Sequence, residues 1–166
     1  MGAVKEELKD LSRAKGSDRI QINNILAAAC VTILSVLLGL SGQQFSTWIV
    51  VQLAAATPLL VTSSLAYAKL SYRDAKEYYL WDNLAWITLS LGYIMLLNSL
   101  AVMLYTTKHS VASWCFIGVT VSLFLVYSAL DVVAKRQRLK EKTWKLGVYL
   151  ALIFFGSVLP ILVGWV

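Results

Sequence analysis

The sequence predicts an all-α polytopic membrane protein, with five transmembrane helices in one antiparallel bundle. Three observations predict this fold class. The chain has 166 residues, of which 58% are hydrophobic and only 14% are charged, whereas soluble domains carry about 25% charged residues. Five apolar stretches are each long enough to cross the ~30 Å hydrocarbon core of a bilayer as a helix. Finally, the basic residues are concentrated in alternate connections between these stretches.

The first element expected is a polar N-terminal segment, residues 1–19. Within it Val4, Leu8 and Leu11 fall on one face of a helix, which predicts a short amphipathic helix on the cytoplasmic membrane surface that ends at Gly16. Short connections make the following helices antiparallel neighbours. The transmembrane domain, residues 20–166, contains the predicted spans 20–41, 46–68, 80–106, 111–133 and 145–166.

The distribution of basic residues predicts the orientation of the chain. The N-terminal segment holds five of the fifteen lysines and arginines, the second connection holds three, and the fourth holds six. The first connection holds none and the third holds only Lys108. Because positively charged connections stay in the cytoplasm, we expect a cytoplasmic N-terminus. Five spans then place the C-terminus at the outer face.

Two acidic residues lie within or beside the predicted spans, Asp82 in the third and Asp131 in the fourth. Asp82 lies about 26 residues before the centre of the tight connection at 107–110, and Asp131 lies about 23 residues after it. The two carboxylates are therefore expected at similar depth near the cytoplasmic face, with Asn83 beside them. Ionisable residues in spans are candidates for function, because a charge in hydrocarbon costs at least ~2.5–3.5 kcal/mol.

A thin polar stripe on the fourth span leads to this acidic pair. At 100° per residue, five residues lie within about 40° of one line along the helix: Ser113, Thr120, Phe124, Tyr127 and Asp131. Carboxylates at the mouth of such a stripe can attract cations. The alternative is structural, because each aspartate can pair with a nearby basic residue or cap a helix, while hydroxyl groups join neighbouring helices.

Small residues and a proline mark the predicted fifth span. Gly156, Pro160 and Gly164 recur every four residues. A proline frees a backbone carbonyl and can kink a helix. Glycines such as Gly147 in the same span, and Gly118 in the fourth, allow helices to approach each other closely. We therefore expect a kink or close helix contacts in this part of the chain.

The sequence predicts no catalytic residue, no cofactor and no metal site. The one histidine, His109, has no cysteine or acidic residue near it in the sequence. Cys30 and Cys115 are not a closely spaced redox pair. Their depths differ by roughly 10 Å at 1.5 Å per helical residue, which is too far for a disulfide. The charge pattern also gives no expectation of nucleic-acid binding, because no basic stripe alternates with exposed aromatics.

Three classes of function are compatible with these features. The first is a small oligomeric channel or transporter for cations, whose pore forms between subunits because five helices enclose little space. The second is a non-catalytic accessory or scaffold subunit of a larger membrane complex, and the third is a lipid-facing membrane enzyme. The sequence favours the first. The expected partners are the lipid bilayer and either further copies of this chain or a larger membrane complex.

Overall fold

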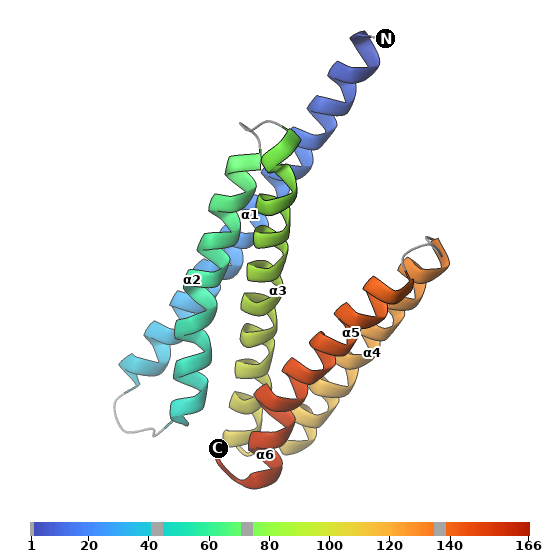
Figure 1. Cartoon of the computed structure of the whole chain (residues 1–166). Coiled ribbons are helices and arrows are strands. Elements are labelled where there is room, and N and C mark those ends of the chain that lie inside the picture. The colour runs from blue at the N-terminus through green and yellow to red at the C-terminus, as the bar shows by residue number, and fades with distance from the viewer. Residues whose placement is uncertain (1, 41–44, 71–74, 135–138) are drawn as a thin grey trace. The chain divides into compact units, whose positions relative to one another are not determined.

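The computed structural model shown in Figure 1 describes residues 2–40, 45–70, 75–134 and 139–166. It describes the side chains of residues 16–40, 45–70, 79–130 and 143–166. Within the described residues every regular element is a helix, as predicted. The elements are α1 (Gly2–Gly39), α2 (Thr47–Leu70), α3 (Ala75–Thr106), α4 (Ser110–Ala134), α5 (Leu139–Ile153), the π-helical segment η2 (Phe154–Val158) and α6 (Leu159–Val163).

In the part of the chain that the structure describes, five helical stretches are long and apolar enough to cross a membrane, which is the predicted number of spans. A helix suits this environment because it satisfies its own backbone hydrogen bonds where no water is present. The ends of these stretches agree with the predicted ends to within four residues. The stretches are Gly16–Gly39, Thr47–Leu70, Tyr79–Thr106, Ser110–Leu130 and Thr143–Val163.

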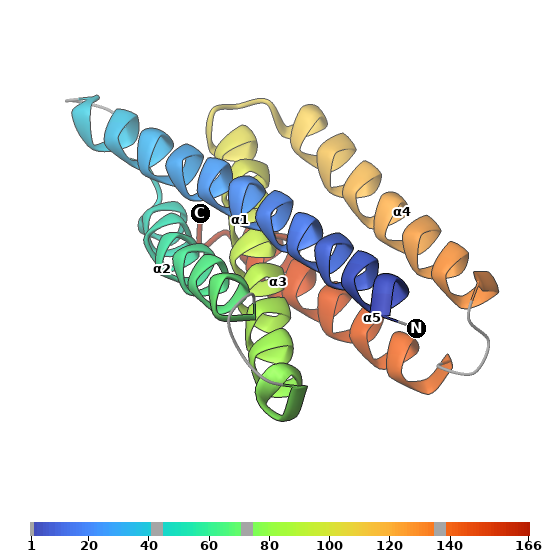
Figure 2. The same cartoon turned by 90° about the horizontal axis from the view of Figure 1, so that it is seen from above.

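The first helix differs from its prediction at Gly16. Figure 2 shows α1 as one unbroken helix from Gly2 to Gly39, so the helix does not end where a separate amphipathic segment was expected to stop. Glycine inside a helix costs only about 1 kcal/mol relative to alanine, and the helical hydrogen bonds continue on both sides of it. The placement of residues 1–19 on the cytoplasmic membrane surface stays a prediction.

The fifth span is not a single regular helix. Helix α5 passes into the π-helical segment, in which the N–H of Leu159 bonds the carbonyl of Phe154, and α6 follows. The last helix ends at Gly164, whose φ of 72° lies in the left-handed region that favours glycine. The N–H of Trp165 then donates to the carbonyl of Pro160 at 3.0 Å. The structure thus has a π-helical segment just before Pro160, where the sequence predicts a kink or close helix contacts.

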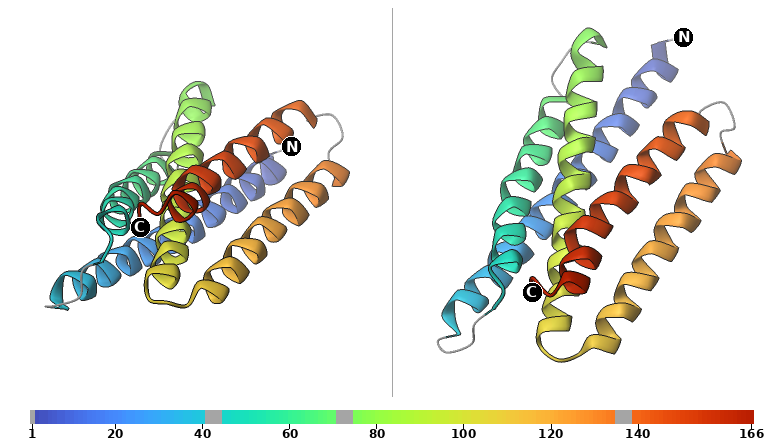
Figure 3. Two further views of the ribbon diagram at one scale, coloured as in Figure 1. Left: turned by 90° about the horizontal axis from the view of Figure 1, so that it is seen from below. Right: turned by 60° about the horizontal axis from the view of Figure 1, so that its bottom comes forward.

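The helices divide into two compact units. The first contains Met1–Gly42 and Leu53–Leu96, and the second contains Gln43–Gln52 and Leu97–Val166. Helices α2 and α3 therefore contribute residues to both units. In the second unit α4 and α5 lie side by side, as both views in Figure 3 show. The arrangement of all five spans in one bundle stays a prediction.

The first unit is packed closely where α2 meets α3. A cluster of buried residues, Ala66, Tyr67 and Ala85, is covered by Trp81 and Leu89 among others. Further along the same two helices, α3 presents Gly92 to α2. A Cβ placed on Gly92 would lie 2.9 Å from Cγ of Leu60 and 3.2 Å from the carbonyl oxygen of Ala56. The absence of a side chain at Gly92 is therefore what allows this approach.

This contact predicts that Gly92→Ala destabilises the protein. Leu60 is fully buried, so the added methyl group must displace it, and overpacking of this kind costs about 1–3 kcal/mol. Gly118→Ala is the matched control, because a Cβ there has no atom within 4 Å and alanine has the higher helix propensity. We expect a lower midpoint of thermal unfolding in detergent for Gly92→Ala and an equal or higher one for Gly118→Ala. Equal midpoints for the two variants would contradict the close contact.

Candidate functional site

The acidic residues singled out in the sequence lie on α3 and α4. Asp82 and Asn83 are half-buried near the start of the third span. Asp131 lies in α4, but its side chain is outside the described part of the structure. Arg73 and Lys135, two basic residues that could pair with these aspartates, are outside it as well. Because Asp82 belongs to the first unit and Asp131 to the second, their proximity stays a prediction.

The polar stripe on α4 changes its surroundings along the helix. Near the start of α4, Ser113 is fully buried and its hydroxyl donates to the carbonyl of Ala101 on α3 at 2.8 Å. Phe124 packs on α5, with its ring 5.3 Å from the ring of Tyr149. Thr120 is half-buried, whereas Tyr127 is 68% exposed. Within the stripe, Ser113 therefore joins α4 to α3, whereas the side chain of Tyr127 is exposed.

Several hydroxyl groups within the spans bond carbonyls of their own helix. Such bonds to the residue four positions earlier satisfy a polar side chain where water is absent. The bonds include Thr32 to Ala28, Thr57 to Leu53, Thr88 to Leu84 and Ser122 to Gly118, at 2.7–3.0 Å. These hydroxyl groups therefore have partners without any ligand.

A second group of polar residues joins α1, α2 and α3 in the first unit. Asn23 Nδ2 donates to Ser63 Oγ at 2.9 Å, and this hydroxyl in turn donates to the carbonyl of Ala85 at 2.8 Å. The next residues along α1 and α2 form a second bond, in which Ser64 Oγ donates to Asn24 Oδ1 at 2.9 Å. None of the described residues donates a hydrogen bond to the fully buried Oδ1 of Asn23. These contacts connect three helices through side chains rather than through apolar packing alone.

Basic residues of the first unit lie on aromatic rings. The guanidinium of Arg19 is 5.2 Å from the ring centroid of Tyr67 and donates to its hydroxyl at 3.3 Å. The ammonium of Lys69 is 4.3 Å from the ring centroid of Trp81. Each contact contributes about 0.5–1 kcal/mol at an exposed site. Basic and aromatic residues at span ends are typical of a membrane interface.

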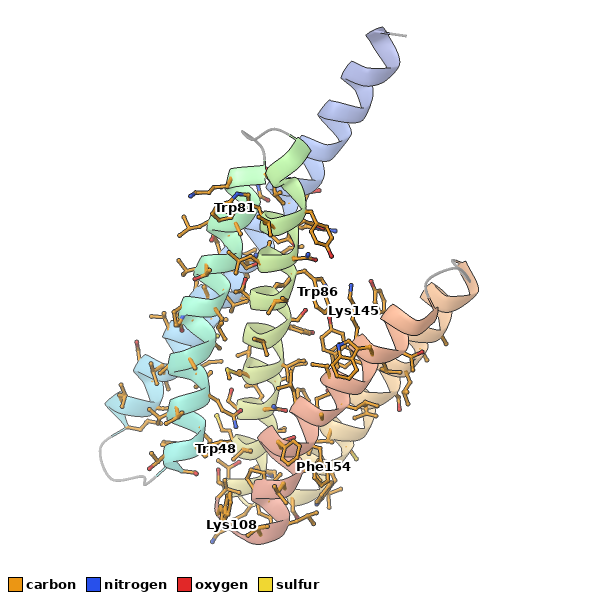
Figure 4. All side chains as sticks on the ribbon, in the orientation of Figure 1. Trp48, Trp81, Trp86, Lys108, Lys145 and Phe154 are labelled. Atoms are coloured by element: carbon orange, nitrogen blue, oxygen red, sulfur yellow. The ribbon has the colours of Figure 1, made fainter. Side chains whose placement is uncertain are left out.

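The second unit contains a polar network around the carbonyl of Gly156. Pro160 has no N–H, so the carbonyl four residues before it lacks its usual helical donor. Two side chains from the start of α2 replace that donor: Trp48 Nε1 donates to Gly156 O at 2.8 Å, and Gln52 Nε2 donates to it at 2.7 Å. Figure 4 labels Trp48 on α2 and Phe154 on the fifth span. The buried Oε1 of Gln52 accepts no hydrogen bond from the residues that the structure describes.

Helix α3 completes this network. Asn98 Nδ2 donates to the carbonyl of Leu152 at 3.0 Å, one turn before Gly156. A Cβ on Gly156 would overlap the Asn98 amide, so this glycine, which the sequence marked for close packing, does allow a close contact. Gly118 and Gly147, marked in the same way, have no atom within 4 Å of an added Cβ. The sequence predicted a carbonyl freed by Pro160 but not the side chains that bond it.

Other chemistry gains no support from the residues described. In that part of the chain no three histidine, cysteine or acidic side chains lie together as a metal site would require. Cys30 is a buried free thiol and Cys115 an exposed one. Comparison with known protein families, curated proteins and solved structures finds no match to this chain. A function therefore has to be argued from the chain's own residues.

The Gly156 network predicts that the loss of stability caused by Gln52→Leu depends on whether residue 160 is proline. In the wild-type chain the substitution removes a buried donor, and such bonds between membrane helices contribute about 0.6–1.7 kcal/mol. In Pro160→Ala, residue 160 regains an N–H four positions after Gly156, so the loss on Gln52→Leu should be smaller. The free energies of unfolding of the four proteins in detergent measure this coupling.

Thr57→Val is the control for this cycle. It lies on the same helix as Gln52 and removes the bond to Leu53, which does not involve the fifth span. We expect Thr57→Val to cost the same with and without Pro160. An equal cost of Gln52→Leu in both backgrounds would contradict the assignment of Gln52 as the donor that replaces the missing N–H.

Proposed function

We propose that this chain is a small integral membrane protein that passes cations as an oligomer, with the pathway formed between subunits. The observation that supports the proposal most is the low burial of α4, the helix that carries the polar stripe. Only 11% of the most apolar part of Ser110–Leu130 is buried, compared with 22% for the first and fifth spans and 44% for the second and third. A helix with exposed polar groups gains from contact with other protein in a bilayer.

The interior of each unit favours a pathway between subunits rather than through one of them. The buried polar side chains described above bond carbonyls or each other, and only Asn23 Oδ1 and Gln52 Oε1 are buried acceptors without a partner among the described side chains. In contrast, Tyr127 is 68% exposed and Thr120 is half-buried. Of the described stripe residues, Tyr127 therefore exposes its hydroxyl group most, and such a group can replace part of the hydration shell of a cation.

In this proposal Asp131 and Asp82 supply negative charge at the cytoplasmic entrance. Asp131 follows Tyr127 by about one helical turn in α4. Asp82 and its neighbour Asn83 lie near the start of the third span, at the depth that the sequence predicts for Asp131. The orientation with a cytoplasmic N-terminus belongs to the same proposal, since it rests on the distribution of basic residues.

The accessory-subunit alternative is favoured by the apolar part of the same helix. Large apolar side chains of α4 are exposed in addition to the stripe, including Val119, Leu123, Val126 and Leu130 at 56–66%. Lipid covers such side chains in a membrane, but a larger membrane protein can cover them equally well. The two candidates differ in what lies against α4, which is another copy of this chain in one case and a different protein in the other.

The channel proposal predicts cation flux that depends on both aspartates. Purified protein in liposomes should pass monovalent cations, and Asp82→Asn combined with Asp131→Asn should lower the flux by about tenfold, because each ~1.4 kcal/mol of lost attraction lowers the local cation concentration tenfold. Asp18→Asn is the matched control, since this exposed aspartate lies in the first turn of the first span, outside the acidic pair. Its flux should equal that of the wild type.

Three outcomes decide between the alternatives. Unchanged flux in the double variant would remove Asp82 and Asp131 from the pathway. A wild-type protein that is monomeric by mass in detergent and passes no cation would overturn the channel proposal and favour the accessory subunit. A symmetric oligomer with flux that falls only in the double variant would support the proposal.

A further inference from the structure

A cavity in the second unit lies outside the stripe and the Gly156 carbonyl. Its volume is about 620 Å³, within the range of about 300–1,000 Å³ typical of small-molecule sites. All of the residues that line it belong to the second unit. They are Phe45, Ser46, Thr47, Trp48, Val51, Thr106, Trp165 and Val166.

The position of the cavity along the spans corresponds to the lipid headgroup layer. The second span begins at Thr47, the third ends at Thr106 and the fifth ends at Val163. The lining residues therefore come from span ends, where a membrane protein meets headgroups and the adjacent water. A ligand of this cavity is accordingly a headgroup or a solute at the interface rather than an acyl chain at the bilayer centre.

The side chains that line the cavity are rich in aromatic rings, and none of them is charged. Three of the eight lining side chains are aromatic (Phe45, Trp48 and Trp165), three carry hydroxyl groups, and two are valines. The faces of aromatic rings are electron-rich and attract cations, tryptophan most strongly. A quaternary ammonium suits such walls, because its methyl groups need no hydrogen-bond acceptor and its charge needs no carboxylate. An isolated phosphate would instead require arginine or lysine, and neither is present in the lining.

Hydrogen bonds hold the ring of Trp48 and the backbone of Trp165 in place. The indole N–H of Trp48 is fixed by Gly156 O at 2.8 Å, and its backbone N–H bonds the hydroxyl of Ser46 at 3.3 Å. Trp165 follows Gly164, whose left-handed conformation reverses the chain, and its N–H bonds Pro160 O at 3.0 Å. A wall that is fixed before binding loses less entropy when a ligand arrives.

We propose that this cavity binds a quaternary ammonium group, either from the headgroup of a choline lipid or from a free organic cation. The proposal does not rest on cation flux, because it concerns binding at one end of the second unit. It makes Phe45 and Trp165 binding residues and gives Trp48 two roles, as an aromatic wall and as the donor to Gly156.

The test is binding of choline to the purified protein in a maltoside detergent, which contains no ammonium group. Choline and tetramethylammonium should both bind by calorimetry, and 3,3-dimethylbutan-1-ol, the uncharged analogue of choline, should bind at least about tenfold more weakly, since ~1.4 kcal/mol of cation–π attraction corresponds to tenfold. Trp165→Leu and Phe45→Leu should each weaken choline binding. Trp114→Leu removes an exposed tryptophan outside the cavity and should leave it unchanged.

The results that overturn the proposal are specific. Equal binding of choline and its uncharged analogue, or choline binding that neither Trp165→Leu nor Phe45→Leu alters, would exclude the aromatic cavity as a quaternary ammonium site, as would absence of choline binding. Trp48→Phe keeps a ring but loses the bond to Gly156. Retained choline binding in this variant would show that the ring at position 48, and not its hydrogen bond, is what binding requires. Competition by phosphatidylcholine but not phosphatidylethanolamine in nanodiscs identifies a lipid source, and equal binding in both lipids identifies a free cation.

Discussion

The structure depends on one constraint: a backbone carbonyl released by proline inside a membrane has no water to bond. An unsatisfied polar group in hydrocarbon costs several kcal/mol, and Pro160 removes the helical donor to Gly156. The protein supplies Trp48 and Gln52 from α2 as replacements. Asn98 from α3 bonds Leu152 one turn earlier. In the second unit, side chains of α2 and α3 therefore bond carbonyls of the same short segment of the fifth span. The end of that span also places Trp165 beside the cavity.

The same constraint accounts for the first unit and for where function is proposed. Asn23, Ser63 and the carbonyl of Ala85 form a chain of hydrogen bonds across three helices, so polar residues there connect helices. Glycine at position 92 lets α2 and α3 come close enough to pack. Because the buried polar groups of each unit are largely engaged in such bonds, the functions proposed above lie at other features, which are the exposed Tyr127 of α4 and the cavity lined by Trp48.

The sequence predicts the fold to the extent that local properties determine it. An apolar run of sufficient length specifies a span, so all five spans are found with their ends within four residues. Because glycine often ends helices, the sequence predicts a helix end at Gly16, but α1 continues through this residue to Gly39. The bonds of Gly156 join residues 104 and 108 positions apart, and no local pattern specifies such partners. Likewise, counting residues from a hairpin predicts the depth of Asp82 and Asp131 but not the distance between them.

The central claim is that this chain crosses the membrane five times from a cytoplasmic N-terminus. Single cysteines at three positions test it directly, in a background with Cys30 and Cys115 replaced by alanine. The positions are 18, at the start of the first span, 109, between α3 and α4, and 166. A membrane-impermeant maleimide should label His109→Cys and Val166→Cys in intact cells, and Asp18→Cys only after permeabilisation. Labelling of Asp18→Cys in intact cells, or of positions 109 and 166 from opposite sides, would contradict the account.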